Sequence, residues 1–226
     1  MLQLTNKRFL IYIFLLILLG TINNRNLKEV NLFQISEINI SGLEASEKKE
    51  LSKKLNFFYF KNLFFLDRSR IEEVFKDNNL VETYQVFKKY PSTLKVKTRK
   101  TKFLAYVKKD DKIFYLGSNS KLIEAQNKND KIPFIFGTFE IQNFLDLKKI
   151  IEESKFNLSE IKNFFFFPSG RIDIETNKGI FIKLPINELR ESLDLSFLIL
   201  QNPKFKKIKI IDLRQKNQVI INGKQF

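Results

Sequence analysis

Strand-like alternation in the middle of the chain constrains its fold more than any other feature. Apolar and polar residues alternate in successive runs between residues 87 and 123, which is the pattern of half-buried β-strands. Tyr90-Pro91 separates two of these runs, because the residue before a proline is pushed out of the helical region. Asp110-Asp111 provides a second turn. A small mixed domain is therefore expected to end near Lys100, with a β-rich domain directly after it.

The residue types that are missing exclude whole classes of chemistry. The chain has 226 residues, enough for one or two domains, and contains neither cysteine nor histidine. Disulfides and thiolate metal sites are excluded, as are Ser-His-Asp catalysis, Cys-His catalysis and every metal site that needs histidine. Chemistry based on pairs of carboxylates stays open.

The formal net charge of +15 is compatible with nucleic acid or an anionic membrane as a partner. The lysines come with many Phe, Ile and Asn residues, however, and this is the residue set of AT-rich codons. No window combines a basic run with interleaved aromatic residues, as a nucleic-acid platform would. A solvated basic surface is the favoured interpretation, and a basic membrane-surface or nucleic-acid-binding protein is kept as an alternative.

The N-terminus has the pattern of a membrane anchor. Lys7 and Arg8 precede an apolar run that ends near Ile22, and no Ala-x-Ala-like cleavage site follows it. The run is interpreted as an uncleaved signal anchor over residues 9–22, although it is short for a spanning helix. By the positive-inside tendency, the N-terminus is expected in the cytoplasm and the bulk of the chain outside it.

The region after the anchor predicts the order β-α-α-β-β. Ile38 and Ile40 begin the first strand, a helix is expected over 45–57 with Ser46 as its N-cap, and a second helix over 70–76 is capped by Asp67 or Ser69. The last two strands are expected at 81–87 and 93–99.

A mixed, β-rich domain with an antiparallel sheet and flanking helices is expected in the remainder. Helices are predicted over 145–155 and 186–200, where apolar residues recur at three- and four-residue spacing. Residues 172–184 predict a hairpin, because alternating runs flank Asn177-Lys178-Gly179. A final short strand is expected over residues 218–221.

Several short motifs resemble the bacterial cell-division family of FtsQ, also called DivIB, which carries a POTRA domain behind a single membrane anchor. They are Ile38-Asn39-Ile40-Ser41-Gly42, Phe64-Phe65-Leu66-Asp67, Tyr90-Pro91-Ser92-Thr93-Leu94-Lys95-Val96, Ala105, Ile132-Pro133-Phe134-Ile135-Phe136-Gly137 and Ile211-Asp212-Leu213-Arg214. The chain departs from the family pattern at Lys100, Phe103 and Gln215. The resemblance implies an α+β chain with this division: 1–8 cytoplasmic tail, 9–22 transmembrane signal anchor, 23–33 linker, 34–101 POTRA domain, 102–226 FtsQ-type β domain.

The resemblance also implies a function. The chain is expected to be a non-catalytic scaffold of the division machinery at the septum, a single-pass protein of the inner membrane with its bulk in the periplasm. FtsB and FtsL are the implied partners, bound at a terminal sheet edge by strand addition, and the POTRA domain is expected to face other division proteins. Carried over by position, the partner-binding residues are Arg214, Gln215, Asn217, Gln218, Val219, Ile220 and Ile221.

An enzyme is not expected, and neither is a cofactor or metal. Asp173 and Glu175 share one strand face, but alternation with Ile172 and Ile174 predicts that this face is solvated, so an acid-base pair is not favoured. The phosphate-binding glycine motifs are absent. A POTRA-type transport or assembly module is a further alternative, for which repeated POTRA units would be expected.

Overall fold

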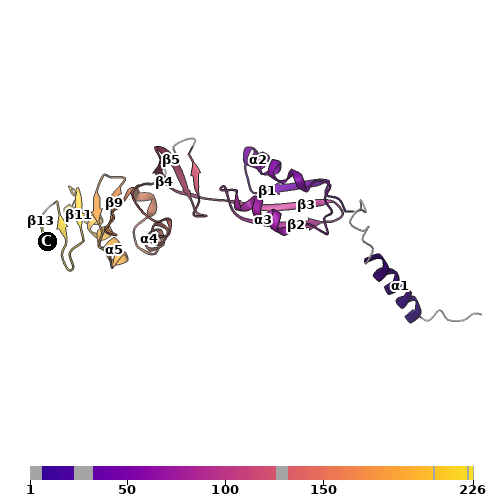
Figure 1. Cartoon of the computed structure of the whole chain (residues 1–226). Helices are drawn as coiled ribbons and strands as arrows, with labels where there is room; N and C mark the ends of the chain where they lie inside the picture. Colours follow the sequence, from indigo (N-terminus) through magenta and orange to yellow (C-terminus); the bar gives the residue numbers. More distant parts are fainter. Residues whose placement is uncertain (1–6, 23–32, 126–131, 206, 223, 226) are drawn as a thin grey trace, which may run out of the picture. The chain divides into compact units, whose positions relative to one another are not determined.

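A computed structural model describes residues 7–22, 33–125, 132–205, 207–222 and 224–225. They fall into two compact units (Figure 1). One contains the chain up to Asn78 together with Thr83–Arg99, and the other contains Asn79–Glu82 together with Lys100–Phe226. The chain therefore crosses between the units around the start of the strand that follows Asn78.

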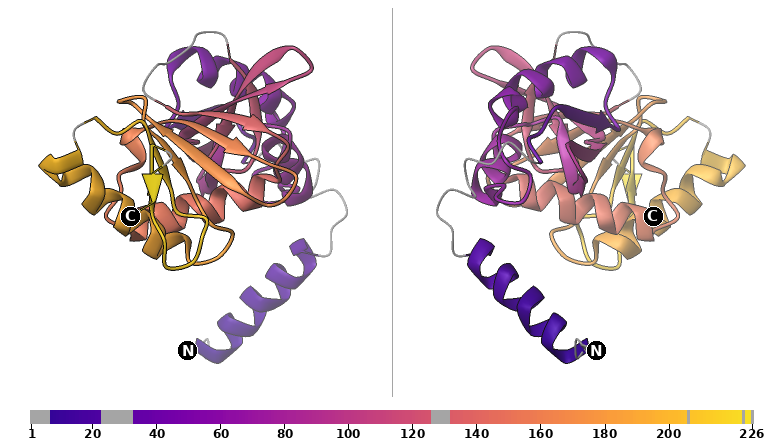
Figure 2. Two further views of the ribbon diagram at one scale, coloured as in Figure 1. Left: turned by 90° about the vertical axis from the view of Figure 1, so that its left-hand side faces the viewer. Right: turned by 90° about the vertical axis from the view of Figure 1, so that its right-hand side faces the viewer.

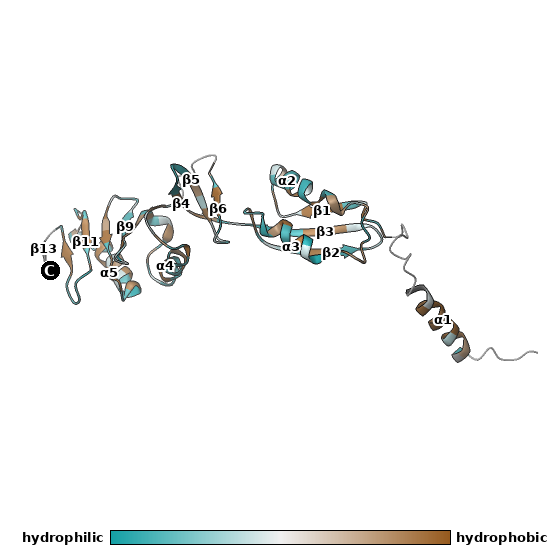
Figure 3. Cartoon of the chain, viewed as in Figure 1, coloured by the Kyte–Doolittle hydropathy of each residue, from teal (hydrophilic) through white to brown (hydrophobic). Residues whose placement is uncertain are grey.

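The first element is the expected N-terminal helix, α1 (Lys7–Ile22), which has 16 residues. Its side chains from Phe9 to Leu19 are apolar and all exposed, between 39% and 73%, and Figure 3 shows this apolar character along the helix. Within the described ranges, no helix meets the length and hydropathy needed to cross a membrane. The helix is confirmed, and the transmembrane anchor stays a prediction.

The first unit has the predicted order of elements. They are β1 (Glu37–Ser41), α2 (Ala45–Leu55), the 3-10 turn η2 (Asn56–Phe58), α3 (Arg68–Lys76), β2 (Val81–Lys89) and β3 (Thr93–Lys100). The sheet order is β1-β3-β2, and β1 runs parallel to β3, with Ile38 opposite Leu94. Leu51, Leu55 and Phe75 are buried residues of the helices, and the Phe75 ring stacks on Tyr84 of β2 with the centroids 3.9 Å apart.

Local signals set the limits of the two helices. Asp67 caps α3, because its side chain accepts the Ser69 N–H at 3.0 Å, as predicted. The predicted Ser46 cap of α2 is wrong: Glu44 is the N-cap, and it forms a capping box with Glu47. Gly42 ends β1 with φ +97°, and a Cβ there would lie 1.7 Å from the Thr98 carbonyl oxygen, which explains the glycine of this motif.

The second unit is built on one large sheet, which Figure 2 shows from two sides. Its strands are β4 (Phe103–Lys109), β5 (Lys112–Gly117), β6 (Leu122–Glu124), β7 (Phe134–Gly137), β8 (Ile161–Phe166), β9 (Ile172–Thr176), β10 (Phe181–Lys183), β11 (Ile210–Asp212), β12 (Ile220–Ile221) and β13 (Lys224–Gln225). Their order is β13-β12-β11-β10-β9-β8-β7-β4-β5-β6. The antiparallel expectation is correct only in part, because the pairs β4–β7, β7–β8 and β10–β11 are parallel.

Two of those parallel pairs, β7–β8 and β10–β11, follow from the helices between the strands, whereas β4 and β7 are separated in the chain by β5 and β6. Helix α4 (Ile141–Glu153) and the short η3 (Leu158–Glu160) connect β7 to β8, while α5 (Leu189–Gln201) and η4 (Pro203–Phe205) connect β10 to β11. A helical crossover returns the chain to the same end of the sheet, so the next strand runs parallel to the last.

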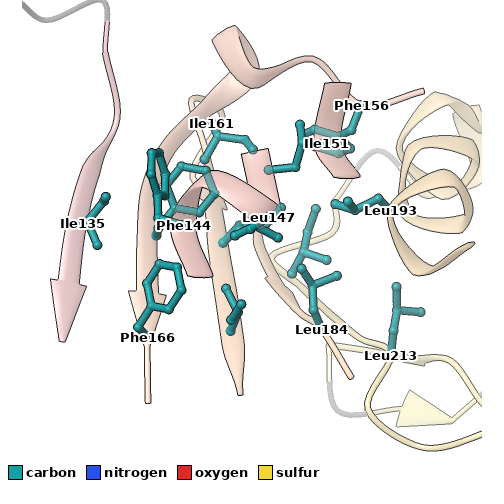
Figure 4. Packing of buried hydrophobic residues seen from close by; sticks show 14 of the residues in the cluster. Ile135, Phe144, Leu147, Ile151, Phe156, Ile161, Phe166, Leu184, Leu193 and Leu213 are labelled. Atoms are coloured by element: carbon teal, nitrogen blue, oxygen red, sulfur yellow. The ribbon is translucent and has the colours of Figure 1, made fainter. Parts of the chain in front are cut away.

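One face of the large sheet carries the hydrophobic core. Phe144 and Leu147 of α4 and Leu193 of α5 are buried in one cluster with sheet residues such as Ile161 and Phe166 (Figure 4). The two helices therefore cover the same face. Both helices were predicted, and α5 begins three residues later than the predicted 186–200 segment.

Aromatic side chains occupy much of the opposite face. Phe134 and Phe136 flank the buried Ile135, and Phe165 lies between the buried Phe164 and Phe166, so alternation directs them away from the helices. The aromatic ladder is defined here as Phe103, Tyr115, Tyr106, Phe134, Phe136, Phe165 and Phe181, whose successive ring centroids lie 4.2 to 6.2 Å apart. Ring packing between neighbouring strands thus stabilises the face that has no helix.

Candidate functional site

A groove of about 800 Å³ lies at one end of the second unit's sheet. It is lined by residues that follow β10 and β11, by the first turns of α5 and by the segment 215–219. The sequence produces this arrangement because both strands run in the same direction and therefore end at the same edge of the sheet. We call this feature the α5 groove.

Apolar residues form part of its wall. Leu184 and Leu213 are almost fully buried where β10 and β11 end, and Figure 4 shows their side chains near Leu193 of α5. Ile186 and Leu195 also line the groove but are 62% and 41% exposed. An apolar strip thus continues from the core into solvent, where a partner could cover it.

Charged residues lie on opposite sides of the groove. Arg171, Arg214 and Lys216 belong to the strand ends and the loop, whereas Glu188 and Glu191 belong to the first turns of α5. The groove is therefore cationic on the sheet side and anionic on the helix side, and this distribution can orient a bound segment.

Arg214 is held by Asp212, the last residue of β11. Its Nε donates to Asp212 Oδ1 at 2.8 Å and its Nη2 donates to Asp212 Oδ2 at 2.5 Å. The Arg214 backbone N–H also donates to Oδ1, at 3.2 Å. These hydrogen bonds hold the pKa of Asp212 below its usual value despite burial and fix the direction of a guanidinium side chain that is 37% exposed.

A row of charges extends from Asp212 across the helix-free face. Lys183 of β10 lies in register with Asp173 of β9 on one side and with Asp212 of β11 on the other. Arg171 stacks on the Phe167 ring at 3.8 Å, and its Nε lies 3.3 Å from Asp173 Oδ1 without hydrogen-bond geometry. Burial raises the pKa of Asp173, against the opposing effect of Arg171 and the other cations.

The residues predicted to bind partners divide into two groups. Arg214, Gln215, Asn217, Gln218 and Val219 line the α5 groove. Ile220 and Ile221 instead form β12, and Ile221 is buried in the core at 5% exposure. The structure thus brings five of the seven residues together in one concave surface.

The prediction that residues 218–221 form a free edge of the sheet is wrong. Strand β12 pairs with β11 on one side and with β13 on the other, where Ile220 lies opposite Gln225. Among the described strands, β13 is therefore the outermost on this side of the sheet. The prediction failed because Lys224 and Gln225 carry no apolar alternation that would indicate a strand.

The solvated carboxylate face was also predicted incorrectly. Asp173 is only 7% exposed, because its strand lies in the interior of a sheet and cations cover the carboxylate. Glu175 Oε2 accepts a hydrogen bond from Asn163 at 2.6 Å. Each carboxylate is thus bound to a neighbouring polar group, and no cluster of potential metal-ligating side chains occurs in the described parts of the chain.

Sequence reasoning missed several residues that shape this surface. Arg171 directly precedes β9 and Leu195 lies on α5, and only the register of the strands and the direction of α5 bring them near Arg214. The Asp-Leu-Arg motif could have pointed to the ion pair, since in an extended chain Asp212 and Arg214, two residues apart, point to the same side.

Comparison with known proteins assigns the first unit to a class. Residues 33–99 match the family model described as the POTRA domain, FtsQ-type. The chain therefore carries a POTRA domain of the FtsQ type, and the resemblance to the FtsQ/DivIB family is confirmed. No curated protein matches the chain.

A solved structure with similarity to the chain is the major extracytoplasmic domain of the cell-division protein DivIB from Geobacillus stearothermophilus, trans isomer. The sequence identity is 16%, and the match covers 46% of this chain and 90% of that chain with a TM-score of 0.34.

Proposed function

We propose that this protein is a non-catalytic scaffold of the bacterial division machinery, which connects early and late division proteins at the septum. The observation that carries the proposal is the FtsQ-type POTRA domain over residues 33–99. The absence of histidine and cysteine and the cation-bound Asp173 and Asp212 agree with a role in binding.

The proposal places the chain at the inner membrane. Helix α1 would hold it there, with the N-terminus in the cytoplasm and the two units in the periplasm. In support, α1 exposes apolar side chains all round, and Lys7 at its start favours the cytoplasmic side. At 1.5 Å per residue, its 16 residues extend about 24 Å.

The α5 groove is the proposed site for FtsB and FtsL. The partner segment would lie between α5 and residues 215–219, cover Leu195 and Ile186, and meet Arg214 on the sheet side. Because cations line the sheet side and glutamates line the helix side, the bound segment should present acidic residues toward Arg214 and Lys216. Ile220 and Ile221 would support the groove from β12, and the POTRA domain would face other division proteins.

The test uses a matched pair of leucines on α5. Leu195 lines the groove and is 41% exposed, whereas Leu198 lies on the same helix, does not line the groove and is 54% exposed. The full chain in detergent micelles is titrated with the FtsB–FtsL complex, comparing Leu195→Asp with Leu198→Asp. We expect Leu195→Asp to weaken binding by about 2 kcal/mol or more, as at an interface hot spot, and Leu198→Asp to bind like the wild type.

Circular dichroism of both variants provides the folding control. Failure of the wild-type chain to bind the complex would overturn the proposed partners. Equal loss in the two variants, with intact folding, would show that the α5 groove is not the site.

A further inference from the structure

The POTRA unit carries a second surface, at the end of its sheet where β1 begins. The start of β1 and the turn between β2 and β3 lie at this end (Figure 1), since Glu37 is in register with Thr93. The Ser36 N–H also donates to the Ser92 carbonyl at 2.9 Å. We call this surface the entry pole.

Three aromatic rings meet at the entry pole from three separate segments. Phe33 and Phe64 lie 4.8 Å apart, Phe64 and Tyr90 lie 4.8 Å apart, and Phe33 and Tyr90 lie 5.9 Å apart. The backbone fixes the cluster, because the Leu63 N–H donates to the Phe33 carbonyl at 2.9 Å. The rings are therefore positioned by the fold and do not depend on one flexible loop.

Two of these three rings are largely exposed, and Phe33 is half-buried. Phe64 is 51% exposed and Tyr90 is 47% exposed, and two neighbours in the segment 60–65 are more exposed still: Phe60 at 76% and Phe65 at 62%. Large exposed apolar groups at one place on a folded domain indicate a surface that something else covers.

Lysines surround the rings. Lys61, Lys88 and Lys89 are exposed, and Lys88 Nζ donates to the Phe64 carbonyl at 2.9 Å. The nearby acids are engaged within the domain: Glu37 accepts the Thr93 hydroxyl at 3.3 Å, and Asp67 accepts the Ser69 N–H and hydroxyl. Aromatic side chains rimmed by lysines match the region between acyl chains and anionic headgroups of a bilayer.

The chain length also places the entry pole near the membrane. From Ile22, the last residue of α1, to Phe33 there are 33 − 22 = 11 peptide steps, which limits the distance between them to about 40 Å. If α1 lies in the bilayer, as the proposed function requires, the rings are held within that distance of its surface.

From these observations we propose that the entry pole docks on the lipid bilayer. Phe60, Phe64, Phe65 and Tyr90 enter the interfacial layer while the surrounding lysines contact anionic headgroups. Docking orients the POTRA domain relative to the membrane, since one end of its sheet is then fixed at the surface. This inference rests on the membrane anchor of the proposed function and adds a second, independent membrane contact.

The absence of tryptophan from the chain makes a direct test possible. Three single-tryptophan variants of the full chain are reconstituted separately in vesicles of phosphatidylcholine and phosphatidylglycerol, with or without brominated phosphatidylcholine as a quencher. Phe65→Trp reports on the entry pole and Phe14→Trp on α1. Phe136→Trp, at a 43% exposed position of the second unit, is the matched control.

We expect brominated lipid to quench Phe65→Trp about twofold more strongly than Phe136→Trp, with a blue-shifted emission, because its ring lies in the interface. Adding Lys89→Glu to Phe65→Trp should reduce the quenching, and Lys49→Glu on α2 should leave it unchanged. The effect should weaken as salt is raised.

The outcomes separate this inference from the proposed anchor. Quenching at Phe14→Trp, with Phe65→Trp no more quenched than the control, would overturn docking and leave the anchor standing. Quenching at Phe65→Trp alone would support docking and overturn the anchor. Because the vesicles contain no other protein, a surface that serves a protein partner would give no quenching at Phe65→Trp, and this result would also overturn the proposal.

Discussion

At the residue scale, two aspartates on neighbouring parts of one sheet face differ in their response to pH. The Arg214 side chain donates two hydrogen bonds to Asp212, and these lower the pKa of Asp212. Asp173 has no such bidentate partner, and burial raises its pKa. Hydrogen bonding therefore determines the direction of the pKa shift at Asp212, and desolvation determines the direction of the pKa shift at Asp173.

The first prediction concerns these two residues. For Asp212, the folded pKa lies below the unfolded value, so its stabilising contribution is present above the unfolded pKa and disappears as pH falls through the folded pKa. Asp212→Asn should lower the free energy of unfolding by about 1.5–3 kcal/mol at pH 7, and the difference should shrink under acid conditions.

Asp173→Asn should not lower the free energy of unfolding at neutral pH, in contrast to Asp212→Asn. The raised pKa means that the folded state favours the protonated form, and this contribution is lost as pH rises through the folded pKa. The variant should therefore be as stable as the wild type or more stable at neutral pH, and the two should converge in acid. Urea unfolding of the full chain in micelles, followed by circular dichroism at pH 7 and under acid conditions, measures how far each variant differs from the wild type in its free energy of unfolding. A destabilisation of similar size in both variants at pH 7 would contradict the assignment.

At the element scale, the short terminal strands show what a sheet adds to a sequence. Strand β12 has only two residues and would not persist by itself. It is kept in place by β11 and β13 on its two sides and by the buried side chain of Ile221. Strand β12 thus contributes to the core, although the sequence predicted a strand at a free edge of the sheet.

The second prediction follows from that burial. Ile221→Asp should reduce the free energy of unfolding by about 3–5 kcal/mol, because it removes a core side chain and buries a charge. Gln218→Asp, at an exposed position three residues earlier, should change it by less than about 0.5 kcal/mol. Urea unfolding followed by circular dichroism gives both values.

This result would change how the partner site is tested. If Ile221→Asp abolishes partner binding, the loss would reflect unfolding, so groove variants such as Leu195→Asp are required to isolate binding. Full stability of Ile221→Asp would show that β12 is not packed in the core.

At the scale of the whole molecule, the net charge of +15 does not define a nucleic-acid site. The aromatic residues of the second unit are stacked on one another: the Phe136 and Phe165 rings are 5.2 Å apart and nearly parallel. Rings whose faces pack together in this way are not available to bases, and stacking on bases is what single-strand binding requires.

The third prediction is that the full chain has no specific affinity for nucleic acid. Binding to duplex or single-stranded DNA should be purely electrostatic, with a Kd no tighter than about 10⁻⁶ M at physiological salt, and it should fall steeply as salt rises. Fluorescence anisotropy of labelled DNA, titrated with the protein in micelles at several salt concentrations, provides the measurement. Nanomolar binding that persists at 0.15 M salt would favour the basic nucleic-acid-binding alternative.

Local patterns in the sequence determined most elements of the two units, but not β13. Period-two alternation indicated strands β3, β4 and β9, and apolar spacing indicated helices α4 and α5, because these patterns depend only on which side chains share a face. The helix cap at Asp67 could likewise be predicted from neighbouring residues, and the exclusion of histidine and cysteine chemistry required only the composition. Short motifs in the right order were enough to predict the FtsQ-type POTRA domain.

The tertiary structure decided what those elements bring together. The parallel pair β10–β11 and the return of α5 place Arg214, Leu195 and Arg171 around one groove, and β13 covers the edge that the sequence left open. Phe33, Phe64 and Tyr90 likewise meet only because three segments end at the same pole of a sheet. Strand order and register depend on contacts between residues far apart in the chain, whereas periodicity records only local neighbours.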